Sequence, residues 1–152
     1  MRATRIILAG LTLALATPCL AGPSDVEYYS ANPEMQLPFS DAVRVGNMLY
    51  LSGKIGNIPG TPNLAEGGIS GETRQTLENI KGSLEKYGSS MNEVVKCTVF
   101  LADIGEWAAM NEVYIQYFPV NPPARSALGA SGLALDARVE IECFAAMKNV
   151  KH

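Results

Sequence analysis

The chain has 152 residues, a formal charge of −3 at pH 7, 47% hydrophobic residues and a single histidine, the terminal His152. This length allows one domain with a sizeable core. The acidic balance argues against non-specific nucleic-acid binding, which needs a basic surface. A single histidine argues against a histidine-based catalytic triad, a histidine–cysteine dyad or a histidine metal site.

The first 21 residues have the pattern of a secretory signal. Arg2 and Arg5 form a positive start, residues 6–16 are almost wholly apolar, and small residues precede a cleavage point after Ala21. The apolar run is shorter than the roughly 20 residues of a membrane span. We therefore expect a cleaved signal peptide over residues 1–21 and a periplasmic or secreted protein, with an uncleaved anchor as the alternative.

Cleavage would leave ten basic and fifteen acidic side chains, a formal charge of −5. A lipoprotein attached through Cys19 fits less well, because a proline precedes that cysteine. The two cysteines of the mature chain, Cys97 and Cys143, lie within apolar segments. An exported protein could join them in a disulfide. We expect instead buried free thiols that behave as small hydrophobic side chains.

After the signal, the pattern predicts a polar N-terminal arm over residues 22–36 and a single domain over residues 37–152. A hairpin is expected around the turn dipeptide Gly46-Asn47, with a nearly apolar returning strand over residues 48–53. Residues 54–69 contain four glycines and two prolines, so we expect an irregular surface loop there.

Two amphipathic helices and a strand follow. Apolar residues three and four positions apart predict a helix over residues 71–87, with Ser70 as its cap. Residues 94–101 form a β-rich strand, and a second helix opens with Asp103 and Glu106 in a capping-box-like spacing. This helix has an apolar stripe that we expect to pack in the core rather than to bind a cofactor. The stripe consists of Trp107, Met110, Tyr114 and Tyr117.

The C-terminal part carries the side chains best suited to chemistry. Pro122-Pro123 favours an extended segment around Arg125. A guanidinium fixed on a strand can bind a planar carboxylate through two parallel hydrogen bonds, although an exposed or ion-paired arginine is the alternative. In residues 139–145 apolar side chains alternate with a second set, Glu140, Glu142 and Phe144. That second set forms either a solvated sheet face or a face partly covered by another subunit, where a carboxylate could serve as an acid or base.

The expected order is two strands, a helix, a strand, a helix and two strands. This order predicts an α+β fold, a two-layer sandwich in which two helices cover one face of the sheet. The helix-free face would carry Glu140, Glu142 and Phe144, and self-association is the simplest way to cover it. The sequence alone leaves open whether the last two strands pair directly.

Several segments resemble the YjgF/RidA family. Pro123-Ala124-Arg125-Ser126 matches its PARS signature, and Val139-Glu140-Ile141-Glu142 matches its IEIE signature. The resemblance extends from about residue 36 to residue 148. Within this range, the other matching segments are residues 38–43, 45–47, 51–56, 72–80 and 94–101.

The resemblance implies a chorismate-mutase-like fold with a mixed sheet, and a homotrimer with clefts between subunits. It also implies hydrolysis of small reactive 2-imino or 2-enamino acids to 2-oxo acids and ammonia, with no metal or cofactor. Arg125 corresponds to the family arginine that binds the substrate carboxylate, and Glu140 to the glutamate that positions or activates water. Other residues that match positions around the family's substrate pocket are Phe39, Ser52, Gly53, Asn111 and Ala127.

Four positions depart from the family pattern. Phe39 stands where many members have tyrosine, and Asp41 and Lys54 each replace a glutamine, so that Lys54 would add a cation beside the turn at Ser52. Ala127 stands where some members have cysteine, which excludes thiol chemistry at that position.

Export is a further departure, since most members of the family are intracellular. These differences keep open a second hypothesis, a non-catalytic protein that binds small ligands or acts like a chaperone. A ribonuclease activity has also been attached to the family. It is disfavoured here by the net acidity, the lack of a basic stripe and the lack of a histidine acid–base pair.

Overall fold

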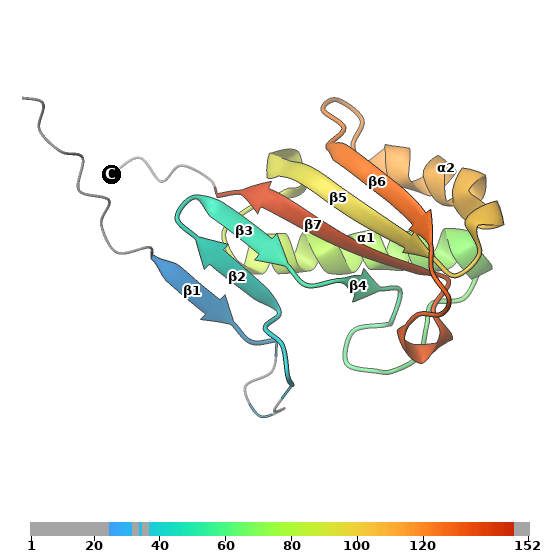
Figure 1. Ribbon diagram of the computed structural model, residues 1–152, viewed down its shortest axis with the longest axis horizontal. Coiled ribbons are helices and arrows are strands. Elements are labelled where there is room, and N and C mark those ends of the chain that lie inside the picture. Colours follow the sequence, from blue (N-terminus) through green and yellow to red (C-terminus); the bar gives the residue numbers. More distant parts are fainter. Residues whose placement is uncertain (1–24, 32–33, 35–36, 148–152) are drawn as a thin grey trace, which may run out of the picture.

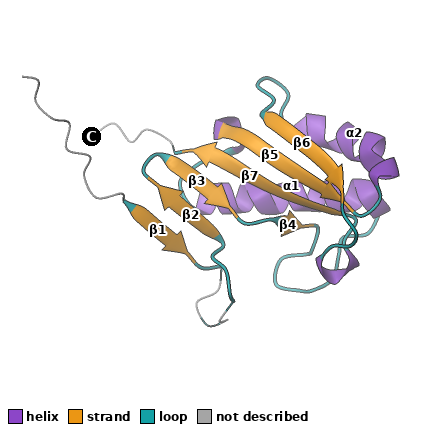
Figure 2. Cartoon of the chain, viewed as in Figure 1, coloured by secondary structure: helices purple, strands orange, loops and turns teal. Residues whose placement is uncertain are grey.

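The computed structural model describes residues 25–31, 34 and 37–147, so the expected signal peptide lies outside the described residues. Its frame is a mixed sheet with two helices packed on one face (Figures 1 and 2). The strands are β1 (Val26–Tyr29), β2 (Ala42–Val45), β3 (Met48–Leu51), β4 (Lys54–Ile55), β5 (Val94–Leu101), β6 (Ala124–Gly129) and β7 (Val139–Ala146).

The strands follow the order β1-β2-β3-β7-β5-β6 across the sheet, and β4 also pairs with β7. β5 and β6 are parallel, whereas all the other pairs are antiparallel. The last strand of the chain therefore lies in the middle of the sheet. Because β5 separates β7 from β6, the two C-terminal strands do not pair directly.

Two helices, α1 (Gly68–Lys86) and α2 (Trp107–Tyr117), lie behind the sheet in Figure 1. Short 3₁₀ turns span Met91–Glu93, Ile104–Glu106 and Ala134–Asp136. The face of the sheet toward the viewer carries neither helix, and we call it the open face. This arrangement confirms the predicted α+β two-layer fold.

The core lies between the sheet and the helices. Alternate residues of β7 are fully buried on the helix face, and Glu140, Glu142 and Phe144 are half-buried on the open face, as the alternation predicts. From α1, the apolar residues spaced three and four positions apart meet this strand. The side chains with no exposed area include Leu77, Ile80, Leu84, Val139, Ile141, Cys143 and Ala145.

α1 begins earlier than its hydrophobic pattern indicates. Gly67 and Gly68 have positive φ angles of 99° and 61°, and glycine allows the chain to turn into the helix at this point. Ser70 therefore lies inside the first turn instead of capping it, which corrects the predicted start. The helix ends at Lys86, close to the predicted end.

α2 also begins differently from the prediction. Asp103 acts as a cap, because its Oδ1 accepts a hydrogen bond of 2.8 Å from the backbone N–H of Gly105. This bond closes the 3₁₀ turn Ile104–Glu106, and the α-helix begins only at Trp107.

Two segments predicted to be irregular contribute strands. Part of the expected polar arm forms β1, which pairs with β2 at one edge of the sheet. The start of the expected loop forms β4, where Lys54 lies opposite Ile141 and Ile55 lies opposite Glu140. Both strands are short and depend on a partner that is distant in sequence, so local patterning does not reveal them.

The two cysteines of the central strands form a disulfide, so the prediction of free thiols was wrong. Cys97 on β5 and Cys143 on β7 are direct antiparallel partners with a Cα–Cα distance of 4.2 Å. Both side chains are completely buried. Their pairing depends on the register of two strands 46 residues apart, which neither segment encodes by itself.

Candidate active site

Arg125 lies on β6 with its side chain on the helix face, above α2. Its Nη1 donates a hydrogen bond of 2.6 Å to Oδ1 of Asn111, and its guanidinium carbon lies 4.6 Å from the ring centre of Tyr114. The ring centre of Trp107 is 5.8 Å away. Burial raises the pKa of Tyr114 to about 12, with the Arg125 charge acting in the opposite direction. The guanidinium is thus held by an amide and two aromatic rings, while its remaining N–H groups are available to a ligand.

A cavity of about 520 Å³ opens beside Arg125, and we call it the Trp107 cavity. Its lining consists of Trp107, Ala108, Asn111, Glu112, Tyr114, Ile115, Phe118, Pro122, Pro123 and Arg125. Met110 and Tyr114 are buried as predicted for the α2 stripe, but Trp107 is 44% exposed and forms a wall of this cavity. The assignment of Trp107 to the core was therefore wrong. Trp107 lies one helical turn before Asn111, and this spacing could have predicted that the two side chains share one face of α2.

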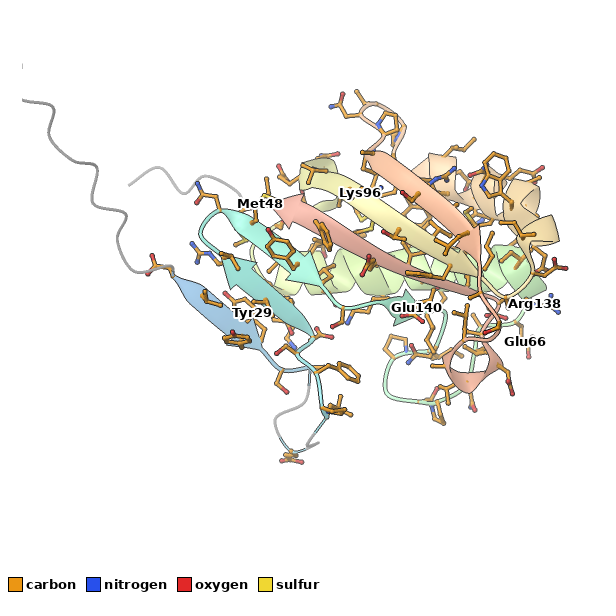
Figure 3. All side chains as sticks on the ribbon, in the orientation of Figure 1. Tyr29, Met48, Glu66, Lys96, Arg138 and Glu140 are labelled. Atoms are coloured by element: carbon orange, nitrogen blue, oxygen red, sulfur yellow. A yellow bond between two sulfur atoms is a disulfide. The ribbon has the colours of Figure 1, made fainter. Side chains whose placement is uncertain are left out.

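Glu140 lies on β7 with its side chain on the open face, where β4 pairs with that strand (Figure 3). Gly53 is the residue that makes room for it. A Cβ atom at Gly53 would stand 1.9 Å from Oε1 of Glu140, so only glycine leaves the carboxylate in this position. Among the described residues, Glu140 has no hydrogen-bond or ion-pair partner. Its carboxylate is therefore available to water or to a ligand.

Ser52, the residue before Gly53, contacts the segment that carries Phe39. The Ser52 hydroxyl donates a hydrogen bond of 2.6 Å to the carbonyl oxygen of Ser40, which fixes the residue next to Phe39. The Phe39 side chain is 61% exposed and borders a smaller cavity of about 370 Å³ with Tyr28 and Leu37. Gly53 and Glu140 thus form one group of the predicted site residues, and the Ser52 hydrogen bond links the segment of Phe39 to Gly53.

The second group consists of Arg125, Asn111 and Ala127. Ala127 lies two residues after Arg125 on β6, faces the helices like Arg125 and packs against the core. In the sheet register, Arg125 lies beside Cys97, which lies beside Cys143 on the buried helix face. Glu140 pairs with Phe100 on the open face. One chain therefore does not bring the two groups together.

Lys54 and Asp41, the two departures from glutamine, form an ion pair with each other. Tyr87 completes the cluster, because its hydroxyl donates a hydrogen bond of 2.8 Å to Oδ2 of Asp41. Burial acts to raise the pKa of Asp41, but the hydrogen bond and charge of Lys54 and the hydrogen bond from Tyr87 outweigh it and hold that pKa below its ordinary value. Lys54 shares the face of Ile141, so it does not add a free cation beside Glu140.

Comparison with known proteins identifies the family of the chain. The family model described as Endoribonuclease L-PSP matches residues 29–147. The chain belongs to this family, the family of YjgF and RidA. It is 43% identical over 108 residues to the 2-iminobutanoate/2-iminopropanoate deaminase of Homo sapiens, covering 71% of this chain and 79% of that protein.

A RutC family protein of Pyrococcus horikoshii is 46% identical over 108 residues, which cover 71% of this chain and 86% of that protein. The crystal structure of the YjgF gene product of E. coli superposes with a TM-score of 0.72 at 30% identity, covering 79% of this chain and 98% of that chain. The names of these relatives differ, and the human relative supports a deaminase-like activity of the YjgF/RidA type.

Within residues 25–31, 34 and 37–147, no helix has the length and apolar character needed to cross a membrane. In the same part of the chain, no group of three His, Cys, Asp or Glu side chains is arranged to hold a metal ion.

Proposed function

We propose that the protein hydrolyses reactive 2-imino and 2-enamino acids to 2-oxo acids and ammonia. The observation that carries the proposal is the held guanidinium of Arg125, which has Asn111 on one side and open N–H groups on the other. A guanidinium in this setting suits a planar carboxylate, the group that all 2-imino acids share. The human relative, whose name states this activity, supports the same assignment.

Glu140 supplies the water chemistry in this proposal. Its carboxylate accepts a proton from a water molecule as the water oxygen bonds to the imine carbon, giving a carbinolamine. Glu140 passes this proton to the imine nitrogen, whose double bond to carbon has opened. It then takes the proton of the carbinolamine hydroxyl and delivers it to the same nitrogen as the carbon–nitrogen bond breaks, so that ammonia leaves and the new carbonyl group completes the 2-oxo acid. Arg125 neutralises the carboxylate throughout and fixes the distance of the imine carbon from the water.

The two groups act together only if two copies of the chain meet. The open face of one copy, with Glu140 and Gly53, would have to approach the Arg125 side of another. We therefore propose a homotrimer with its sites between subunits, in which each copy contributes Arg125 to one site and Glu140 to another. The half-buried Phe144 and Glu142 on the open face support a covered surface there.

Export is part of the proposal. The pattern of residues 1–21 supports a periplasmic or secreted address, and the disulfide between Cys97 and Cys143 supports it too, because disulfides persist in oxidising compartments.

Turnover of freshly generated 2-iminopropanoate tests the activity. The wild-type protein should accelerate loss of the imine, and Arg125→Ala should abolish the acceleration while it remains folded and oligomeric. Arg74→Ala, which removes an exposed arginine of α1, serves as the matched control and should keep full turnover. Undiminished turnover by Arg125→Ala contradicts the site. An inactive wild type that still binds 2-oxo acids through Arg125 supports the non-catalytic binding protein instead.

The family description names an endoribonuclease, but the open face does not favour RNA. Glu140 and Glu142 place two carboxylates there, and the nearby cation Lys96 donates a hydrogen bond of 2.8 Å to Ser126 (Figure 3). A phosphodiester backbone would meet net negative charge on this surface.

A further inference from the structure

The Trp107 cavity is larger than the proposed small substrates require. Its volume of about 520 Å³ falls within the range of roughly 300–1,000 Å³ that is typical of sites for drug-sized ligands. In a single copy of the chain, a three-carbon imino acid bound to Arg125 would leave most of this space unfilled.

The lining of the cavity combines a polar anchor with apolar walls. Arg125 and Asn111 gather the polar groups that suit a carboxylate. The other walls are largely apolar, and they include Trp107 at 44% exposure and Ile115 at 63% exposure. Large apolar side chains left exposed around a polar anchor indicate a surface that an apolar ligand covers.

One charged group lines the cavity besides Arg125. Glu112 is exposed on α2 next to Asn111, and its carboxylate disfavours a second negative charge on a ligand. The cavity therefore suits a ligand with one carboxylate bound to Arg125 and an uncharged apolar body.

We propose that the Trp107 cavity selects 2-imino acids with large apolar side chains, branched aliphatic or aromatic, over 2-iminopropanoate. This inference rests on the proposed function and names its substrate class. Trp107, Ile115 and Phe118 are the specificity-determining residues, since they contact the side chain of the substrate and not its reacting carbon. The alternative occupant, an apolar segment of a second copy, would leave no room for a large side chain.

Binding can be measured without turnover, because Trp107 is the only tryptophan of the chain and its fluorescence reports on the cavity. Pyruvate and 4-methyl-2-oxopentanoate are stable product analogues that share the carboxylate and the carbonyl group and differ only in the side chain. We expect the Kd for 4-methyl-2-oxopentanoate to be at least about tenfold lower than the Kd for pyruvate. Arg125→Ala should weaken the binding of both acids.

A matched pair of variants tests the cavity wall. Ile115 lines the cavity, and Val120 is an exposed apolar residue at 80% that does not. Ile115→Ser should bring the ratio of the two Kd values toward one, and Val120→Ser should leave that ratio as in the wild type. Equal Kd values in the wild type, or an unchanged ratio in Ile115→Ser, would overturn the inference.

Turnover separates this inference from the proposed function. We expect a higher kcat/KM for 2-imino-4-methylpentanoate than for 2-iminopropanoate, by about tenfold or more. Hydrolysis of both imines with equal kcat/KM contradicts the side-chain preference and leaves the deaminase intact. If the protein hydrolyses neither imine but still binds 4-methyl-2-oxopentanoate more tightly than pyruvate, the deaminase proposal is contradicted and the preference of the cavity for large apolar side chains stands.

Discussion

Arg125 and Glu140 lie on opposite faces of the same sheet. Arg125 shares the buried row of Cys97 and Cys143, whereas Glu140 points to the open face beside Gly53. A small substrate cannot touch both side chains of one chain, because a layer of backbone and core separates them. Any mechanism that uses both residues therefore makes assembly a condition of activity.

Complementation between inactive variants tests this condition. Arg125→Ala and Glu140→Gln should each be inactive alone, but oligomers that contain both chains should recover activity. If each site takes one residue from each of two neighbours, an equal and random mixture has native residues at about one quarter of its sites. Co-expression with two different tags and purification of the mixed oligomer provides the sample. A mixed oligomer as inactive as its parents would contradict a shared site.

Gly53→Ala should impair activity without unfolding the protein. The new Cβ would overlap Oε1 of Glu140, the end of a flexible side chain that can swing away. We expect the free energy of unfolding to change by less than about 1 kcal/mol and kcat/KM to fall by about 10- to 100-fold, since catalysis depends on the position of this carboxylate. Urea unfolding and imine turnover measure the two effects.

Gly82→Ala is the matched control for this change. Gly82 lies within α1 with open space around its Cα, so alanine should stabilise the helix by about 0.5–1 kcal/mol and leave turnover unaltered. Equal losses of turnover in Gly53→Ala and Gly82→Ala would show that contact with Glu140 is not the cause.

The sequence predicts most of what depends on local periodicity. The alternation of residues 139–145 separates the buried side chains of β7 from Glu140 on the open face, and residues 94–101 match β5. Helix starts were less well predicted, because the positive φ of Gly67 decides where α1 begins. The motifs around Arg125 and Glu140 identify the family, and the comparisons confirm that part.

The structural features that could not be predicted from the sequence depend on the register between distant strands. The disulfide requires that β5 and β7 pair with Cys97 opposite Cys143. The separation of Arg125 from Glu140 requires that β5 lie between β6 and β7. The pairing of Asp41 with Lys54 is a similar case, because each replacement by itself suggests a new free charge. Together they form a compensated pair on the helix side of the sheet.

Asp41→Asn should lower stability in a way that depends on pH. The side chain of Asp41 is only 10% exposed and that of Lys54 only 17%, so loss of the pair at pH 7 should cost about 1–3 kcal/mol. The folded-state pKa of Asp41 lies below its ordinary 3.8, so its contribution is fully present above pH 3.8 and disappears as the pH falls through the lowered pKa. The difference between wild type and variant should therefore shrink in strongly acidic buffer.

Urea unfolding at neutral pH and below pH 3 measures this difference. Glu27→Gln is a suitable control, because its ion pair with Arg44 is well exposed and should contribute little. A difference between wild type and Asp41→Asn that persists unchanged into strong acid would rule out the ionised carboxylate as its source.

The disulfide between Cys97 and Cys143 should stabilise the protein. It closes a loop between residues 46 apart, and the loss of entropy in the unfolded chain corresponds to about 4 kcal/mol. The double variant Cys97→Ala/Cys143→Ala should lose stability on this scale without leaving an unpaired thiol.

Because both cysteines are fully buried, reductant should act on the wild type only under unfolding conditions. Thiol titration in denaturant of a chain that consists of residues 22–152 should find no reactive cysteine before reduction and two afterwards. Two reactive thiols before reduction would mean that the strands meet but the bond does not form.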